Sequence, residues 1–322
     1  MALKGRMKPV VDYTTYVLLR VVICLIQTVT LETCAACARG LSYLLADVIR
    51  LRNRTVDENL KIALPTLAVR EQRMLKRRMW EHLILMICEI AHAPRKLRQT
   101  NWLNYVAIEG RREIVCYLLD QRPMIIVSGH FGNFEVGGYL IGLLGFPTHA
   151  IARTLDNPYV DQFVKAFRER KGQYILPKDG SATQVAELLQ SGGTVTILAD
   201  QHAGPKGCWV DFMGQPTSCH KAVALFTLSS GAPMLVISNT RTGPPLHYTV
   251  RLEGLAEPYE LGDGLASVPG MTRWYNQCLE AAIRRTPDQY WWLHRRWRGD
   301  PPPRKGAKVA ADASTESQRP AA

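Results

Sequence analysis

The chain has 322 residues, of which 47% are hydrophobic, and this is enough for one large domain or for one domain with an attached helical segment. Its formal net charge of +12 favours acidic partners such as anionic lipid headgroups, nucleic acid or an acidic carrier protein, and charge alone does not choose among them. The eight cysteines are scattered through apolar or helical stretches, which argues against a disulfide framework and indicates reduced thiols in a cytoplasm-facing protein.

The first predicted element is an apolar helical segment over residues 1–52. Its longest uncharged run, 21–31, is shorter than the roughly 20 residues that span a bilayer. Arg20 splits the apolar region, which is not typical of a cleaved signal peptide. We therefore expect a membrane-associating helix that lies at the interface, with basic residues near anionic headgroups. A core helix of a soluble domain is the alternative.

Helical patterning continues to about residue 120 and predicts two further helices. The first begins near Asp57 and ends at Pro65. The second covers 69–93 and has one apolar face. The opposite face is basic, which either solvation or apposition to a membrane explains. Its charged residues are Arg70, Arg73, Lys76, Arg77 and Arg78.

From about residue 122 short apolar strands alternate with helices. The predicted strands are 124–127, 148–152, 174–176, 194–199, 233–238 and 247–252, the last of which alternates like an edge strand. The predicted helices are 134–144, 157–171, 182–190, 221–229 and 270–285. Strands separated by helices predict an α/β fold with one mixed central β-sheet flanked by helices. This domain would cover 53–299, and 300–322 is predicted to be a disordered tail.

The segment SGHFGNFE, residues 128–135, carries the most informative chemical pattern in the chain. It places His130 after a buried strand and five positions before Glu135. An imidazole oriented by a carboxylate can act as a general base on a hydroxyl, and no nucleophilic Ser or Cys is obviously part of the pattern. Alternatively, His130 caps a helix and Glu135 is an unrelated surface residue. The neighbouring glycines favour a site, because they let backbone and ligand approach closely.

A second polar group, which begins with Asp200 and Gln201, directly follows a predicted strand. It lies at the carboxyl end of that strand, where α/β sheets place their ligands. Asp200 could face His130 as a second orienting carboxylate. Equally, it could cap its own loop by accepting backbone N–H bonds, which is the commoner use of an aspartate at a strand end.

Basic residues form the third group. Arg153 follows a strand, and Arg168, Arg170 and Lys171 end the next helix. Guanidinium groups there could bind phosphates or stabilise a developing oxyanion, although charged helix ends are also ordinary partners of the helix dipole. Among these residues we expect Arg153 and Arg170 to take part in the site.

Five motifs occur in the order seen in one family of acyltransferases. They are SGHFGNFE from 128, ARTLDNPYVD from 152, RERKG from 168, ADQHAGPKG from 199 and PDQYWWLHRRWR from 287. Over roughly residues 10–298 the chain resembles the lipid A biosynthesis lauroyl/myristoyl acyltransferases, which include related bacterial glycolipid acyltransferases. Five ordered motifs are far more specific than the spacing of His130 and Glu135 alone.

The resemblance implies a glycerolipid-acyltransferase-like fold and a membrane-associated O-acyltransferase. Such an enzyme moves a fatty acyl chain from acyl-carrier protein or acyl-CoA to a hydroxyl of a glycolipid such as a lipid A precursor, at the cytoplasmic face of the inner membrane. It needs no metal or cofactor, forms no acyl-enzyme and has no nucleic-acid partner. The net charge of +12 favours an acidic carrier as donor.

The same resemblance assigns roles to individual residues. His130 is the catalytic base and Glu135 its partner. The substrate-binding positions are Arg153, Arg170, Asp200 and Gln201. His202 stands where an acidic residue is usual in the family, so the acceptor stays open. The chain also lacks the acidic Gly-Thr phosphate motif of glycerol-3-phosphate acyltransferases, which argues against a glycerolipid acceptor.

Two other function classes remain as alternatives. One is a metal-dependent hydrolase, although no two histidines have the i, i+4 spacing of a zinc helix. Its four ligands would be His130, Glu135, Asp200 and His202. The other is a basic nucleic-acid-binding module, for which the chain has no recognisable motif. A Gly-x-Ser-x-Gly esterase is excluded because that motif is absent from the sequence.

Overall fold

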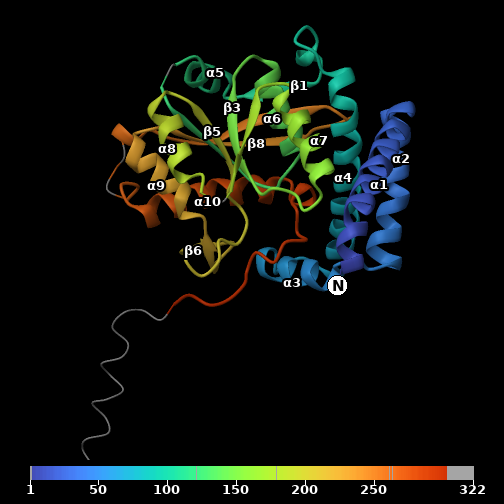
Figure 1. Ribbon diagram of the computed structural model, residues 1–322. Helices are drawn as coiled ribbons and strands as arrows, with labels where there is room; N and C mark the ends of the chain where they lie inside the picture. The colour runs from blue at the N-terminus through green and yellow to red at the C-terminus, as the bar shows by residue number, and fades with distance from the viewer. Residues whose placement is uncertain (1, 121, 179, 261, 263, 303–322) are drawn as a thin grey trace, which may run out of the picture.

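The computed structural model describes residues 2–120, 122–178, 180–260, 262 and 264–302, with the side chains described from residue 7 onward. The predicted disordered tail lies outside the described residues from position 303. At the centre of the protein is a seven-stranded sheet with the order β1-β9-β8-β2-β5-β3-β4 (Figure 1). The strands are β1 (Val106–Glu109), β2 (Met124–Ser128), β3 (Thr148–Ala152), β4 (Gln173–Pro177), β5 (Thr194–Leu198), β8 (Met234–Arg241) and β9 (Tyr248–Ala256).

The sheet is mixed. Strands β8 and β9 pair antiparallel, while the other neighbouring strands pair parallel. Along β2 the side chains alternate between the two faces, so that Ile125 and Val127 join one core while Met124 and Ile126 join another. Both faces are therefore covered, which explains why β2 is a continuous apolar run. This architecture confirms the predicted α/β fold with a mixed central sheet.

Six helices of the α/β domain cover the sheet. They are α5 (Arg111–Leu119), α6 (Phe134–Leu143), α7 (Pro158–Glu169), α8 (Ala182–Gln190), α9 (Lys221–Ser230) and α10 (Val268–Arg285). Helices α8, α9 and α10 share the core of Ile125 and Val127. Helices α5 and α6 lie on the opposite face, and α7 packs against α6 through Tyr139 and Phe167. The cavity described below lies on the side of α5 and α6.

The helices before the sheet form a separate layer beside it (Figure 1). They are α1 (Ala2–Thr28), α2 (Leu31–Tyr43), a π-helix (Leu44–Val48), α3 (Asn53–Ala63) and α4 (Val69–Lys96). Helices α1 and α2 both pack on α4, which in turn contacts α6. The basic face of α4 is partly used within the protein, because Arg73 and Arg77 pair with Asp47 and Lys76 pairs with Asp57.

The apolar part of helix α1 is longer than the uncharged run 21–31 on which the sequence prediction rested. Its segment Met7–Thr28 is long and apolar enough to cross a membrane, judged by length and composition only, and it is not buried within the protein. Arg20 interrupts the uncharged run without ending the helix, since its guanidinium lies over the ring of Phe163, 5.0 Å from the centroid, and donates to Tyr16. The exposure of this segment does not fit the alternative of a core helix.

The strand predictions were wrong at the sheet margin. Strand β1 was not predicted, because four residues within a helical region are too short to show a strand period. It pairs with β9, so the predicted edge strand 247–252 is internal and the sheet ends at β1 and β4. A hairpin of β6 (Cys208–Phe212) and β7 (Gln215–Cys219) was also not predicted, and it lies outside the main sheet.

Candidate active site

The loop that follows β2 carries His130 to the carboxyl edge of the sheet. Strands β2 and β5 are parallel neighbours in which Ser128 pairs with Leu198. His130 and Asp200 each lie two residues beyond these paired positions, and the register therefore brings them together. The Nδ1 atom of His130 lies 2.8 Å from Oδ1 of Asp200. The backbone N–H of His130 donates to Oδ2 of the same carboxylate over 2.9 Å.

The His130–Asp200 pair is largely buried. Asp200 is only 2% exposed. Burial alone would raise the pKa of Asp200, but the charge of His130, two hydrogen bonds from His130 and the charge of Arg296 outweigh it and lower the pKa. Burial likewise opposes protonation of His130, yet Asp200 and, more weakly, Glu135 raise the pKa of His130 above its ordinary value. The dyad can therefore hold a proton that His130 has accepted.

The hydrogen bond to Asp200 fixes the tautomer of His130. With Nδ1–H donating to the carboxylate, Nε2 is the nitrogen that can accept a proton. The side-chain amide of Gln201 lies 3.2 Å from Nε2 and donates to it. The rings of Phe134 and Trp291 pack edge-on against the imidazole at centroid distances of 5.1 and 5.6 Å. These contacts hold the ring in one orientation.

Two glycines in the loop are required by close approach. Gly132 has a φ of +59°, and a Cβ atom there would lie 1.9 Å from the carbonyl oxygen of Asn239. A Cβ atom at Gly129 would lie 3.1 Å from Cγ of Asp200. The glycines thus allow the loop to pack against β8 and against the dyad, as the sequence analysis expected for a site.

Glu135 does not make the predicted hydrogen bond to His130. Within the described residues its carboxylate accepts from Arg168, over 3.0 Å from Nε and through a second, shorter bond from Nη2. The prediction failed because Glu135 lies in the first turn of α6, while His130 lies in the loop before that helix and faces β5. Asp200 takes the orienting position instead. The backbone N–H that it accepts belongs to His130, in the loop after β2, whereas the alternative interpretation had Asp200 capping its own loop.

The cations are arranged differently from the prediction. Arg153 and Arg170 were predicted to take part in the site, but Arg168 enters it, from the last turn of α7. Burial would lower the pKa of Arg168, but the carboxylate of Glu135 outweighs it and raises the pKa. The side chain of Arg153 is 77% exposed and pairs with Asp156, while Arg170 is exposed at the end of α7. Apolar residues at helical spacing, such as Val160, Val164 and Phe167, mark the inner face of α7, and Arg168 lies beside that face. This signal could have identified Arg168, and the prediction did not use it.

Arg153 nevertheless lies near the site. It lines a hollow of about 340 Å³ together with Arg168 and Lys165, beside the end of β3. Its charged lining is three cations and the carboxylate of Asp161, and this excess of positive charge suits an anionic group. Arg170 does not line this hollow.

An apolar cavity of about 170 Å³ opens beside the Glu135–Arg168 pair. It lies between the sheet and helices α5 and α6, and most of its lining side chains are aliphatic or aromatic. A ten-residue helix such as α6 is about 15 Å long, and the cavity follows it away from His130. At the far end it is lined by Val115, Leu118 and Phe146.

The tryptophan-rich segment 290–297 contacts the loop that follows Asp200. The backbone N–H of His202 donates to Nε2 of His294 over 3.1 Å. Arg296 is buried, and its Nη1 atom donates to the carbonyls of Gln201 (3.2 Å) and Ser218 (2.8 Å). Charged residues within an apolar segment were the one local sign of this contact.

The four residues of the metal-site alternative do not converge. Within the described part of the chain, no group of three or more His, Cys, Asp or Glu side chains is arranged to hold a metal ion. Glu135 is bound to Arg168, and the ring of His202 packs against Trp209.

Comparison with known proteins identifies the family. The family model described as bacterial lipid A biosynthesis acyltransferase matches residues 6–299. The lipid A biosynthesis lauroyltransferase of Escherichia coli K12 is 24% identical over 81% of this chain and 84% of its own. The palmitoleoyltransferase of the same strain is 23% identical over 79% of this chain and 81% of its own.

Among solved structures, the 1-acyl-sn-glycerophosphate acyltransferase PlsC from Thermotoga maritima aligns with 81% of this chain and all of its own, at 14% identity and a TM-score of 0.39. This similarity is too low to argue from. The family model, in contrast, covers nearly the whole chain and confirms the resemblance seen in the five motifs. The protein therefore belongs to the bacterial lipid A biosynthesis acyltransferase family and is an O-acyltransferase.

Proposed function

We propose that the protein transfers a fatty acyl chain from a thioester donor to a hydroxyl of a lipid A precursor, with His130 as general base. The observation that carries the proposal is the dyad of His130 and buried Asp200, at the carboxyl edge of the sheet and next to an apolar cavity. A base beside an apolar cavity suits direct attack by an acceptor hydroxyl on a bound acyl thioester.

In the proposed reaction, Nε2 of His130 takes the proton of the acceptor hydroxyl as its oxygen attacks the thioester carbonyl. Asp200 holds Nδ1–H and stabilises the imidazolium. The tetrahedral intermediate then collapses, so that the C–S bond breaks and the leaving thiolate takes the proton back from His130. A correctly placed general base contributes about 10²–10⁴ in rate. No acyl-enzyme forms.

Arg168 and Glu135 have a second role in this proposal. Arg168 lies at the mouth of the cavity, where a guanidinium would stabilise the developing oxyanion, and Glu135 fixes its direction through two hydrogen bonds. Glu135 thus remains a catalytic-site residue as the partner of Arg168. Gln201 would help to place the acceptor beside Nε2. Arg153 and Arg170 remain candidates for the anionic groups of the acceptor.

The acyl chain would lie in the apolar cavity along α6, with its carbonyl at the mouth and its end near Val115 and Phe146. The depth of the cavity would then set the preferred acyl length. The net charge of +12 favours acyl-carrier protein over CoA as the donor. The exposed apolar helix α1 would hold the enzyme at the cytoplasmic face of the inner membrane.

The test is acyl transfer by His130→Ala and His130→Gln, measured by mass spectrometry with purified protein in detergent or vesicles. We expect kcat/KM to fall by at least about 10² in both variants. Retention of the wild-type rate, or isolation of a stable acyl-enzyme, would contradict the mechanism. Lipid analysis of a deletion strain would identify the acyl chain and the acceptor.

A further inference from the structure

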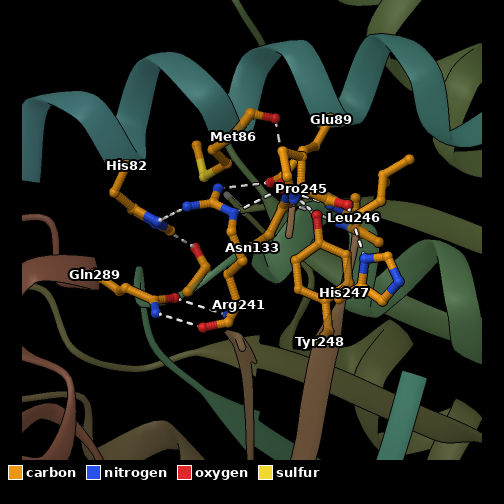
Figure 2. A network of polar contacts seen from close by, with 12 residues as sticks. His82, Met86, Glu89, Asn133, Arg241, Pro245, Leu246, His247, Tyr248 and Gln289 are labelled. Carbon is orange, nitrogen blue, oxygen red and sulfur yellow. Dashed lines mark hydrogen bonds and ion pairs between the residues drawn. The ribbon is translucent and has the colours of Figure 1, made fainter. Parts of the chain in front are cut away.

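A second polar cluster is buried between helix α4 and the loop that carries His130 (Figure 2). We call it the Glu89–Arg241 cluster, and it consists of Glu89, Arg241, His82 and Asn133. Glu89 is 0% exposed, and its two carboxylate oxygens accept from Nε and Nη2 of Arg241, each over 2.6 Å. The pair joins α4 to the end of β8 in a bidentate geometry.

The cluster holds the backbone just after His130. Nδ2 of Asn133 donates to Oε2 of Glu89 over 3.1 Å. Nε2 of His82 lies 3.2 Å from the carbonyl oxygen of Gly132. Nδ1 of His82 lies 3.0 Å from Nη1 of Arg241. Because the guanidinium can only donate, Nδ1 of His82 accepts and Nε2–H donates to Gly132.

The protonation states support this geometry. Burial and the charge of Arg241 lower the pKa of His82 to about 3, so the ring stays neutral. Burial would raise the pKa of Glu89, but hydrogen bonds and charge from Arg241 outweigh it and lower the pKa, so the carboxylate stays ionised. The cluster is therefore a fixed pattern of donors and acceptors across the pH range in which His130 works.

Backbone hydrogen bonds hold the rest of the loop. The N–H of Asn133 donates to the carbonyl of Asn239 over 2.9 Å, and the N–H of Gly132 donates to the carbonyl of Gln289 over 3.0 Å. The cluster also extends to the turn between β8 and β9. Leu246 has a φ of +65°, which is rare for a bulky residue, and its N–H donates to Oε1 of Glu89 over 2.9 Å.

Stability alone does not account for a buried pair of this kind. Two charges lose their hydration on burial, and well-packed apolar residues of similar volume are often as stabilising or more so. The pair also restricts the geometry of the loop, because a bidentate ion pair with further hydrogen bonds to the loop permits few backbone conformations. We propose that Glu89, Arg241 and His82 are positioning residues that fix the backbone of the loop 129–133 and thereby the direction in which His130 presents Nε2. This inference rests on the proposed role of His130 as base.

The proposal is tested with Glu89→Gln, Arg241→Lys and His82→Phe in the full-length protein. We expect kcat to fall by about 10–10², while KM for donor and acceptor stays within about threefold, because the groups that bind the substrates are untouched and only the base is misplaced. The matched control is Glu257→Gln. It breaks the 2.6 Å pair with Arg122 near the start of β2, at the opposite edge of the sheet, and should leave kcat unchanged.

A double variant separates positioning from stability. Arg241→Met alone leaves a buried carboxylate without its partner, and we expect a lower Tm and a lower kcat. Glu89→Gln/Arg241→Met removes both charges, so Tm should return toward that of the wild type while kcat stays low. Recovery of kcat together with Tm would overturn the inference, as would a Glu89→Gln enzyme that behaves like Glu257→Gln. If the single variants do not fold, the double variant and His82→Phe decide.

His130→Ala is measured in parallel. If that variant keeps its rate, the assignment of the base fails. If it is inactive while the variants of the Glu89–Arg241 cluster keep the wild-type kcat, only this inference fails.

Discussion

Two carboxylates lie near His130, and they belong to two differently built regions. Asp200 is at the end of a central strand, almost fully buried, and it bonds directly to the imidazole. Glu135 is in the first turn of α6, partly exposed at the mouth of the cavity, and it bonds to Arg168 of α7. Glu135 is close to His130 in sequence, whereas Asp200 is 70 residues away. The carboxylate that bonds to His130 is therefore selected by the register of β2 and β5 and not by closeness in sequence.

Asp200 and Glu135 thus have separate structural partners, whereas the sequence pattern had joined Glu135 directly to His130. The strand region orients the base, and the helix region holds a cation beside the cavity. Loss of Asp200 should therefore change the tautomer and the pKa of His130. Loss of Glu135 should mainly release Arg168.

The largest expected effect is that of Asp200→Asn. An amide at this position no longer selects the Nδ1–H tautomer or stabilises the imidazolium, so we expect kcat/KM to fall by about 10²–10⁴. Steady-state acyl transfer measures it, and Asp211→Asn, which changes an exposed carboxylate of the β6–β7 hairpin, is the control. A loss below tenfold would show that Asp200 does not orient the base.

A somewhat smaller loss is expected from Arg168→Gln. Removal of a group that stabilises an oxyanion lowers kcat by about 10²–10³. Glu135→Gln keeps Arg168 in place and should lose less, by about tenfold. Arg54→Gln, at an exposed arginine of α3, is the control for both. If Glu135→Gln is as damaging as Asp200→Asn, the two regions do not have separate roles.

The cavity should give a change of specificity rather than of rate. Val115→Phe shortens the far end, so the ratio of kcat/KM for long and short acyl donors should fall by about tenfold. Competition between two donors, read by mass spectrometry, measures this ratio. Leu119→Phe adds the same ring at an exposed position of α5 and should leave the ratio unchanged.

The smallest expected effect is a shift of the pH profile of activity, and the dyad predicts its direction. His130 must be neutral to act as base, and its pKa is raised, because the charges of Asp200 and Glu135 outweigh burial. Activity should therefore rise with pH through an acid limb that lies above the ordinary histidine value of about 6.5. In Asp200→Asn the lowering of the pKa of His130 by burial should dominate. The acid limb of the residual activity should therefore move to lower pH. A limb that moves upward or stays in place would contradict the dyad.

Local patterns predicted much of the domain correctly. The strand 124–127 and the helix 134–144 agree with β2 and α6 to within one residue, because a buried apolar run and a following helix are both local signals. The helix 182–190 agrees with α8 at both ends. Strand β1 and the internal position of β9 were missed, since pairing between strands about 140 residues apart leaves no local trace.

Five ordered motifs and a strand–loop–helix pattern are properties of neighbouring residues, so they were enough to predict the family, the alternating α/β order and His130 as the candidate base. Folding brings together residues that are distant in the chain: Asp200 rather than Glu135 bonds to His130, Arg168 rather than Arg170 bonds to Glu135, and Glu89 meets Arg241. Local patterns do not show these contacts, because hydrogen bonds depend on distances of about 3 Å, which are set by strand register and helix packing between distant segments.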